Sequence, residues 1–155
     1  QRISGLVIVD GAYHTPGPLE NTPFVQGLRN AYPATLKHFV DLCVSEPDSD
    51  HIKQWGMHIL ERATQAAAIA LYLLPSGIDI RAGLPGMAQP ALILHGENDR
   101  LVTLAQSQWL ADTLPNSKLA ILPGAGHVPT VTFPGEVARE INNFFGRTAA
   151  QSAES

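Results

Sequence analysis

The sequence is poor in cysteine, in long apolar runs and in basic clusters. A single cysteine, Cys43, excludes an internal disulfide, and its apolar neighbours predict a buried side chain rather than a reactive thiol. The longest apolar run, residues 66–74, is much shorter than the roughly 20 residues that cross a bilayer. With 10 Lys and Arg against 14 Asp and Glu, the chain has no basic stripe for nucleic acid. We therefore expect a globular protein of the cytoplasm, without a nucleic-acid or membrane partner.

Two further absences concern the start of the chain and nucleotide binding. The first residue is Gln rather than Met, and an apolar segment follows without a charged leader, so we expect that an N-terminal part is missing. No Gly-x-Gly-x-x-Gly motif follows this apolar segment, which argues against a nucleotide-binding Rossmann domain. The hydrophobic content of 45% is nevertheless sufficient for the core of one domain.

Three short apolar runs predict parallel strands, because strands that are covered on both faces are apolar throughout. They span residues 6–10, 91–95 and 118–122, and each is followed by a glycine or a proline. Between the second and third runs, Thr103 and Gln106 form a capping-box pattern at the start of a helix long enough for a crossover. After the third run, Pro134 and the spaced apolar residues that follow it predict a last helix packed on the sheet.

The long interval between the first and second strands has a different pattern. It contains helical patterns separated by prolines and no recognisable strand. An interval of about 80 residues is too long for a simple crossover and favours an inserted helical cap. The predicted organisation is a core formed by residues 1–10 and 91–146, a helical cap (lid) with its return segment over 11–90, and a disordered tail over 147–155.

Asp99 and His127 follow the second and third strands at matching places, four and five residues beyond the strand ends. The carboxyl ends of parallel strands meet at one edge of the sheet, where the sites of open α/β sheets lie. Because neighbouring strands are roughly 5 Å apart, the carboxylate and the imidazole can form a hydrogen bond. Each residue alone also fits an ordinary loop position. The pair predicts that Asp99 orients His127, which acts as a general base toward a nucleophile.

Several other residues are candidates for the same site. Asp10 also ends a strand and is an alternative acid for His127. Tyr13 and His14 after the first strand, Trp55 in the cap and Val128 beside His127 are expected to line a substrate pocket. Such a lining favours a small-molecule substrate with an apolar portion. Neither a cofactor nor a metal site is expected.

The segments "PALILHGENDRLV" and "LPGAGHVPTVTFPGEVAREINNFF" resemble the C-terminal half of α/β-hydrolase-fold enzymes. In that family the catalytic acid follows the penultimate strand and the histidine follows the last one. The resemblance implies that Asp99 is the triad acid and His127 the triad base. "RISGLVIVDGA" resembles the strand after the nucleophile helix, and 11–90 resembles the cap domain. The implied fold is a partial α/β-hydrolase fold with three parallel strands, crossover helices and an inserted helical cap, and the implied reaction is hydrolysis of an ester, lactone or related bond.

The sequence departs from the family in its catalytic nucleophile. The family carries the nucleophile on a Gly-x-Ser-x-Gly elbow before the acid and the histidine, and no such motif occurs here. The early His-Gly loop that supplies oxyanion donors is also absent. We therefore expect a C-terminal fragment that is inactive alone and self-associates through the bare edge of strand 6–10. An aspartate nucleophile, lyase or peroxidase chemistry and a non-catalytic interaction module stay open as alternatives.

Overall fold

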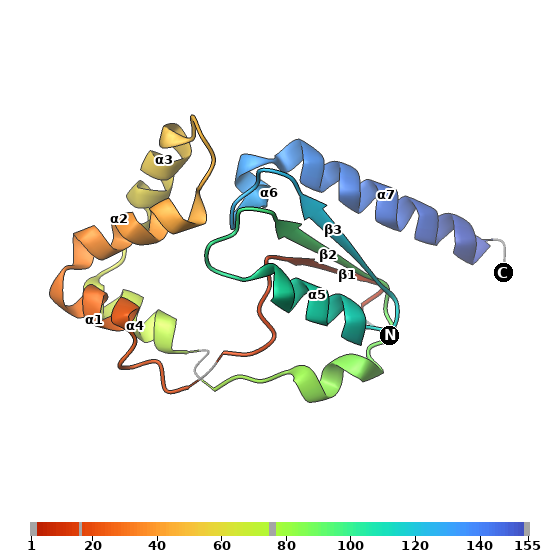
Figure 1. Cartoon of the computed structure of the whole chain (residues 1–155), viewed down its shortest axis with the longest axis horizontal. Helices are drawn as coiled ribbons and strands as arrows, with labels where there is room; N and C mark the ends of the chain where they lie inside the picture. The colour runs from red at the N-terminus through yellow and green to blue at the C-terminus, as the bar shows by residue number, and fades with distance from the viewer. Residues whose placement is uncertain (1–2, 16, 75–76, 154–155) are drawn as a thin grey trace.

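The computed structural model describes residues 3–15, 17–74 and 77–153 and contains a three-stranded parallel sheet (Figure 1). The strands are β1 (Leu6–Val9), β2 (Ala91–Gly96) and β3 (Ser117–Leu122), in the order β1-β2-β3. β2 pairs with both neighbours, with Ala91 opposite Leu6 on one side and opposite Ser117 on the other. The predicted strands and their parallel arrangement are therefore confirmed, and the strands that precede Asp99 and His127 are neighbours.

The central strand β2 is buried on both of its faces. Leu92, Ile93 and Leu94 have no exposed surface, which explains why the sequence pattern here is continuously apolar rather than alternating. Each fully buried side chain of this size stabilises the fold by about 1.5–3 kcal/mol relative to an exposed one. The middle strand of the sheet is thus the best-packed element of the core.

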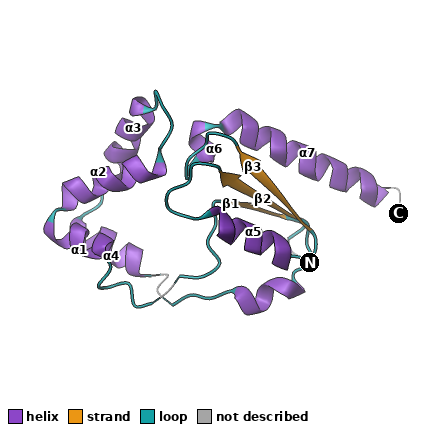
Figure 2. Cartoon of the chain, viewed as in Figure 1, coloured by secondary structure: helices purple, strands orange, loops and turns teal. Residues whose placement is uncertain are grey.

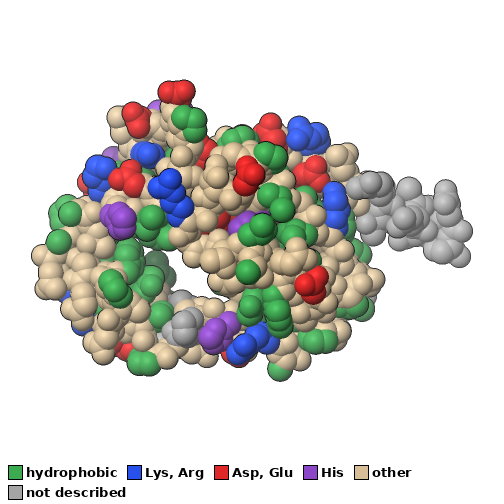
Figure 3. All heavy atoms as spheres, viewed as in Figure 1, with side chains coloured by type: hydrophobic (Ala, Val, Ile, Leu, Met, Phe, Trp, Pro, Cys, Tyr) green, Lys and Arg blue, Asp and Glu red, His purple; other side chains and the backbone are tan. Residues whose placement is uncertain are grey.

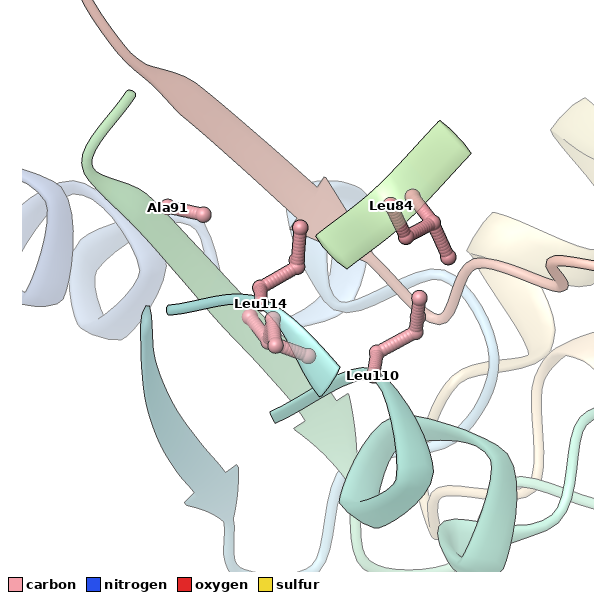
Figure 4. Packing of buried hydrophobic residues seen from close by; sticks show 5 residues of the cluster. Leu84, Ala91, Leu110 and Leu114 are labelled. Atoms are coloured by element: carbon pink, nitrogen blue, oxygen red, sulfur yellow. The ribbon is translucent and has the colours of Figure 1, made fainter. Parts of the chain in front are cut away.

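Helices cover the two faces of the sheet. On one face, the helix α5 (Leu104–Thr113) and the short 3-10 helix η1 (Arg81–Gly86) pack on β2, with Leu84, Leu110 and Leu114 close to Ala91 (Figure 4). On the other face, α7 (Pro134–Ala153) covers β2 through Val137. Figure 2 shows this layered arrangement, with the strands between the helices. The sheet is therefore held with its carboxyl edge free to carry loops.

The predicted helical cap consists of four helices between β1 and β2. α1 packs on both α2 and α4, α2 also packs on α3, and the rings of Phe24 and Tyr72 lie 4.8 Å apart in this group. Thr22 and Thr64 act as N-caps and accept hydrogen bonds from backbone N–H groups of α1 and α4. The cap lies beyond the carboxyl ends of the strands (Figure 1). Its helices are α1 (Pro23–Asn30), α2 (Tyr32–Cys43), α3 (Asp50–Leu60) and α4 (Gln65–Leu73).

The two ends of the cap insertion are joined by a short antiparallel contact. His14 and Asp79 form an isolated bridge, and Ile80 N–H donates to the Tyr13 carbonyl. The return segment then enters η1, whose Leu84 belongs to the core under the sheet. The insertion is consequently closed at its base, and its return segment is part of the core packing.

Three local expectations are corrected by the structure. Helix α7 continues to Ala153, whereas we expected a disordered tail from residue 147; alanine and glutamine favour helix, and an existing helix extends without a new nucleation step. Thr103 is the N-cap of α5, but its side chain makes no capping hydrogen bond. A short helix α6 (Pro129–Thr132), which the sequence did not indicate, precedes α7.

Among the described residues, none of the helices combines the length and the apolar character needed to cross a membrane.

Candidate active site

Asp99 and His127 form a hydrogen-bonded pair at the carboxyl edge of the sheet. His127 Nδ1 lies 2.8 Å from Asp99 Oδ2. The Asp99 side chain has no exposed surface, whereas a quarter of the His127 side chain is exposed. With Nδ1 held by the carboxylate, Nε2 is the ring nitrogen that can exchange a proton with a reacting group. The two residues that the sequence predicted to meet therefore do so, in the geometry of a base and its orienting acid.

The Asp99 carboxylate also stabilises its own loop. Its Oδ1 accepts hydrogen bonds from the backbone N–H groups of Leu101, at 2.7 Å, and Val102, at 3.0 Å. An aspartate that bonds to the backbone two and three residues ahead is typical of a tight turn. Three donors thus surround one buried carboxylate.

Glycine allows the Asp99 loop and the His127 loop to approach each other closely. A Cβ at Gly96 would overlap the backbone carbonyl of Gly126, which precedes His127. The backbone of the Asp99 loop also donates a hydrogen bond from Asn98 N to the Ala125 carbonyl, at 2.8 Å. The close approach explains why β2 ends in glycine, since any side chain there would push the His127 loop away from Asp99.

The loop between α2 and α3 of the cap forms hydrogen bonds with both the Asp99 loop and the His127 loop. Glu46 Oε1 accepts a hydrogen bond from Gly126 N at 2.8 Å, and the Cys43 carbonyl accepts one from His127 N at 3.0 Å. Ser45 Oγ donates to the Asn98 carbonyl at 3.3 Å. No pattern in the sequence indicated Glu46 or Ser45, because they contact residues that are far away along the chain. The sequence shows only that Glu46 stands next to a proline, Pro47.

Asp10 lies beside the Asp99–His127 pair rather than in it. It is buried at the end of β1 in a left-handed conformation, with φ of 45°, and its Oδ1 accepts a hydrogen bond from Gly96 N at 2.8 Å. Burial is the main cause that raises the pKa of Asp10 to about 7, and the charge of Asp99 adds to this effect. The residue predicted as an alternative acid is thus a neighbour of the acid that contacts His127.

His95 belongs to the same buried polar group. Its Nδ1 lies 2.9 Å from Ser107 Oγ and 3.2 Å from Asp10 Oδ1, and burial lowers the pKa of its ring. In this position His95 joins β2 to α5. Single donor atoms of Asp10, Asp99 and His127 lie within 4.8 Å of one another, which is close enough for a metal ion. Because Asp99 already accepts three hydrogen bonds, this group fits an acid–base cluster better than a coordination site.

The residues expected to line a pocket divide into two sets. Trp55 and Val128 line an apolar cavity of about 200 Å³ between α2, α3 and the chain after His127. Tyr13 instead packs on Trp109, with the ring centroids 4.2 Å apart, and His14 forms the bridge at the base of the cap. The expectation for Tyr13 and His14 came from their position after β1, but the chain turns there toward the core.

Two other features of the cap bear on the site. Cys43 is buried, as predicted, and burial together with the Asp99 charge raises the pKa of its thiol to about 11. A larger cavity of about 590 Å³ lies between α1, α2 and α4, and its lining includes Phe24, Phe39, Tyr72 and Leu101. Leu101 connects this cavity to the Asp99 loop. Figure 3 shows the surface hollowed between the cap helices and the sheet.

Comparison with known proteins identifies the class of fold. A bromoperoxidase from Bacillus anthracis matches with a TM-score of 0.81 and 21% identity, over 94% of this chain and 59% of the other chain. A pimeloyl-(acyl-carrier protein) methyl ester esterase from Nitrosomonas europaea is 32% identical over 117 residues, 73% of this chain and 46% of the relative. The esterase of that name from Aromatoleum aromaticum is 38% identical over 121 residues, 76% of this chain and 48% of the relative. No family model matches the chain.

The chain has the α/β-hydrolase fold. Both of these curated relatives are esterases by name. The chain spans about half the length of the curated relatives that it matches.

Proposed function

We propose that this chain supplies the acid and the base of a nucleophile–His–Asp triad in an ester hydrolase. The single observation that carries the proposal is the hydrogen bond of 2.8 Å between His127 Nδ1 and the buried carboxylate of Asp99. The pair lies at the carboxyl edge of a parallel sheet, where α/β enzymes gather their reacting groups. The proposal is also supported by two relatives that are named as esterases.

In the proposed reaction, His127 Nε2 accepts the proton of a nucleophilic hydroxyl while that hydroxyl attacks the ester carbonyl. Asp99 keeps the imidazole in the tautomer with its proton on Nδ1 and stabilises the imidazolium that forms. His127 then returns the proton to the leaving alkoxide, and in the second half of the reaction it activates water in the same way. General-base catalysis of this kind contributes about 10²- to 10⁴-fold in rate, provided that a nucleophile is within reach.

The nucleophile is expected outside this chain. The sequence contains no Gly-x-Ser-x-Gly motif, and the relatives are about twice as long as the aligned part. We therefore propose that the chain is the C-terminal part of the enzyme and has no hydrolytic activity by itself.

For the substrate we propose an alkyl ester with an apolar acyl portion. The cavity of about 590 Å³ is lined mainly by apolar and aromatic side chains of the cap and adjoins the Asp99 loop through Leu101. A cavity of this size and character accepts an acyl chain. The names of the two relatives refer to the methyl ester of pimeloyl-(acyl-carrier protein), which is an alkyl ester of this chemical class.

The test begins with the reading frame upstream of Gln1. An in-frame Gly-x-Ser-x-Gly supports the proposal, whereas a start codon immediately before Gln1 favours a non-catalytic interaction module. The protein encoded by the longer frame is then assayed with p-nitrophenyl esters of increasing acyl length, next to the 155-residue chain. We expect turnover only from the longer protein, with a loss of at least about 10²-fold in His127→Ala. Turnover by the 155-residue chain, or an unchanged rate in the His127 variant, contradicts the proposal.

A further inference from the structure

The starting point is a buried carboxyl group that the proposed triad does not use. The Asp10 side chain is only 1% exposed, and its Oδ1 is held by Gly96 N. Its second oxygen, Oδ2, is buried and has no hydrogen-bond partner among the described residues. A buried ionised oxygen without a partner is costly, whereas a protonated oxygen can donate to an acceptor nearby.

The carboxylate of Asp99 is an acceptor group close to Asp10. One donor atom from each of Asp10, Asp99 and His127 lies within 4.8 Å of the other two. An ionised carboxylate has about four lone-pair positions. Leu101 N, Val102 N and His127 Nδ1 occupy three of them, which leaves one position, on Asp99 Oδ2. The structure thus contains one unsatisfied oxygen on Asp10 and one open acceptor position on its neighbour.

Two carboxyl groups at such a distance do not both ionise easily, and the environments of these two differ. Asp99 receives three hydrogen bonds, whereas Asp10 receives one. The proton is therefore held by Asp10. Burial, which raises the pKa of Asp10 to about 7, acts in the same direction.

We propose that Asp10 is a positioning residue of the site, whose neutral carboxyl donates its proton to Asp99 Oδ2 and thereby fixes the Asp99 carboxylate toward His127. This inference rests on the proposed function for its catalytic meaning, but not for its geometry. Asp99 then has all four acceptor positions filled, two by its own turn, one by His127 and one by Asp10. The acid of the pair is consequently held by β1 and by its own loop together.

Several titratable groups face this cluster and define the background of a titration. His95 on β2 lies beside Asp10, and the loop between α2 and α3 places Cys43 and Glu46 next to the His127 loop.

The experiment follows the Asp10 carboxyl and the His127 Nδ1 proton by NMR in the 155-residue chain, without any substrate. In the unmodified chain we expect the Asp10 carboxyl ¹³C signal to titrate near neutral pH. In Asp10→Asn, which tolerates the left-handed backbone and keeps a neutral donor, the low-field Nδ1 proton signal of His127 should stay as it is in the unmodified chain. Asp10→Gly, which also tolerates this backbone, should lose the low-field Nδ1 proton signal of His127, whereas Asp10→Asn should retain it. Asp112→Asn, which changes an exposed aspartate on α5, is the matched control and should leave both the Asp10 titration and the low-field His127 proton signal unchanged.

Two results overturn the inference. One is an Asp10 carboxyl that ionises near pH 4, like an exposed aspartate. The other is a low-field Nδ1 proton signal of His127 that Asp10→Gly retains to the same extent as the Asp112→Asn control. Neither readout depends on ester hydrolysis, so a failed activity assay leaves this inference intact, and a failed titration leaves the Asp99–His127 proposal intact.

Discussion

The bond between the cap and the His127 loop can be tested with two glutamates that make the same kind of contact in different environments. Glu46, buried in the cap, accepts a hydrogen bond from Gly126 N at 2.8 Å. Glu97, exposed after β2, accepts one from Gly124 N in the same loop at 2.9 Å. The bonds have nearly equal lengths, so a difference between Glu46→Ala and Glu97→Ala reports the effect of burial.

We expect Glu46→Ala to lower the free energy of unfolding by about 2 kcal/mol. A hydrogen bond to a charged group contributes about 1.5–3 kcal/mol, and its loss leaves the Gly126 N–H buried without a partner. The buried second oxygen, Oε2, has no partner among the described residues, and its removal offsets part of the loss. The exposed bond of Glu97 competes with water, so Glu97→Ala should cost no more than about 0.5 kcal/mol.

Urea unfolding of the two variants, followed by circular dichroism, measures this difference. With a slope of about 2 kcal/mol per molar urea, Glu46→Ala should lower the midpoint by about 1 M and Glu97→Ala by about 0.2 M. Equal shifts for the two variants would refute the reasoning, because burial would then have no influence on the bond. A Glu46→Ala midpoint equal to that of the unmodified chain would show that the cap does not hold the His127 loop.

Three further predictions concern the site and the sheet. Gly96→Ala should destabilise the chain by about 1–3 kcal/mol and shift the His127 ring signals, since the added methyl meets the Gly126 carbonyl; unchanged ring signals would contradict the close approach. The free energy of unfolding should fall by at most about 4 kcal/mol as the pH rises from about 4 to 7, because the folded chain retains an Asp10 proton that the unfolded chain releases. Urea titrations at several pH values measure this slope, and Asp10→Asn should flatten it. The unpaired edge of β1, with Val7 38% exposed, should cause self-association, and a stable monomer of 16.6 kDa in size-exclusion chromatography would exclude it.

The sequence was informative where local pattern and topology act together. β2 could be recognised because burial on both faces demands an unbroken apolar run, and all six of its residues are buried. The meeting of Asp99 and His127 followed from a rule about parallel strands, and the structure places the two side chains 2.8 Å apart. Neither inference required knowledge of the cap.

Contacts between distant segments could not be predicted in this way. Glu46 bonds to a backbone group 80 residues away, and Asp10 to one 86 residues away. Such bonds depend on how the cap and the sheet lie together, and no periodicity in either segment encodes that arrangement. The misjudged tail has a different cause, since 147–153 lacks an apolar period but has residues that readily extend an existing helix.

Asp99 shows why a turn residue and a catalytic acid need not be competing interpretations of one aspartate. Oδ1 accepts the two backbone hydrogen bonds that form the turn, and Oδ2 faces His127. The turn fixes the carboxylate plane, so the oxygen that faces His127 is oriented before any substrate arrives, and little conformational entropy remains to be lost at that side chain. The turn that made Asp99 look like an ordinary loop residue in the sequence therefore also orients its carboxylate toward His127.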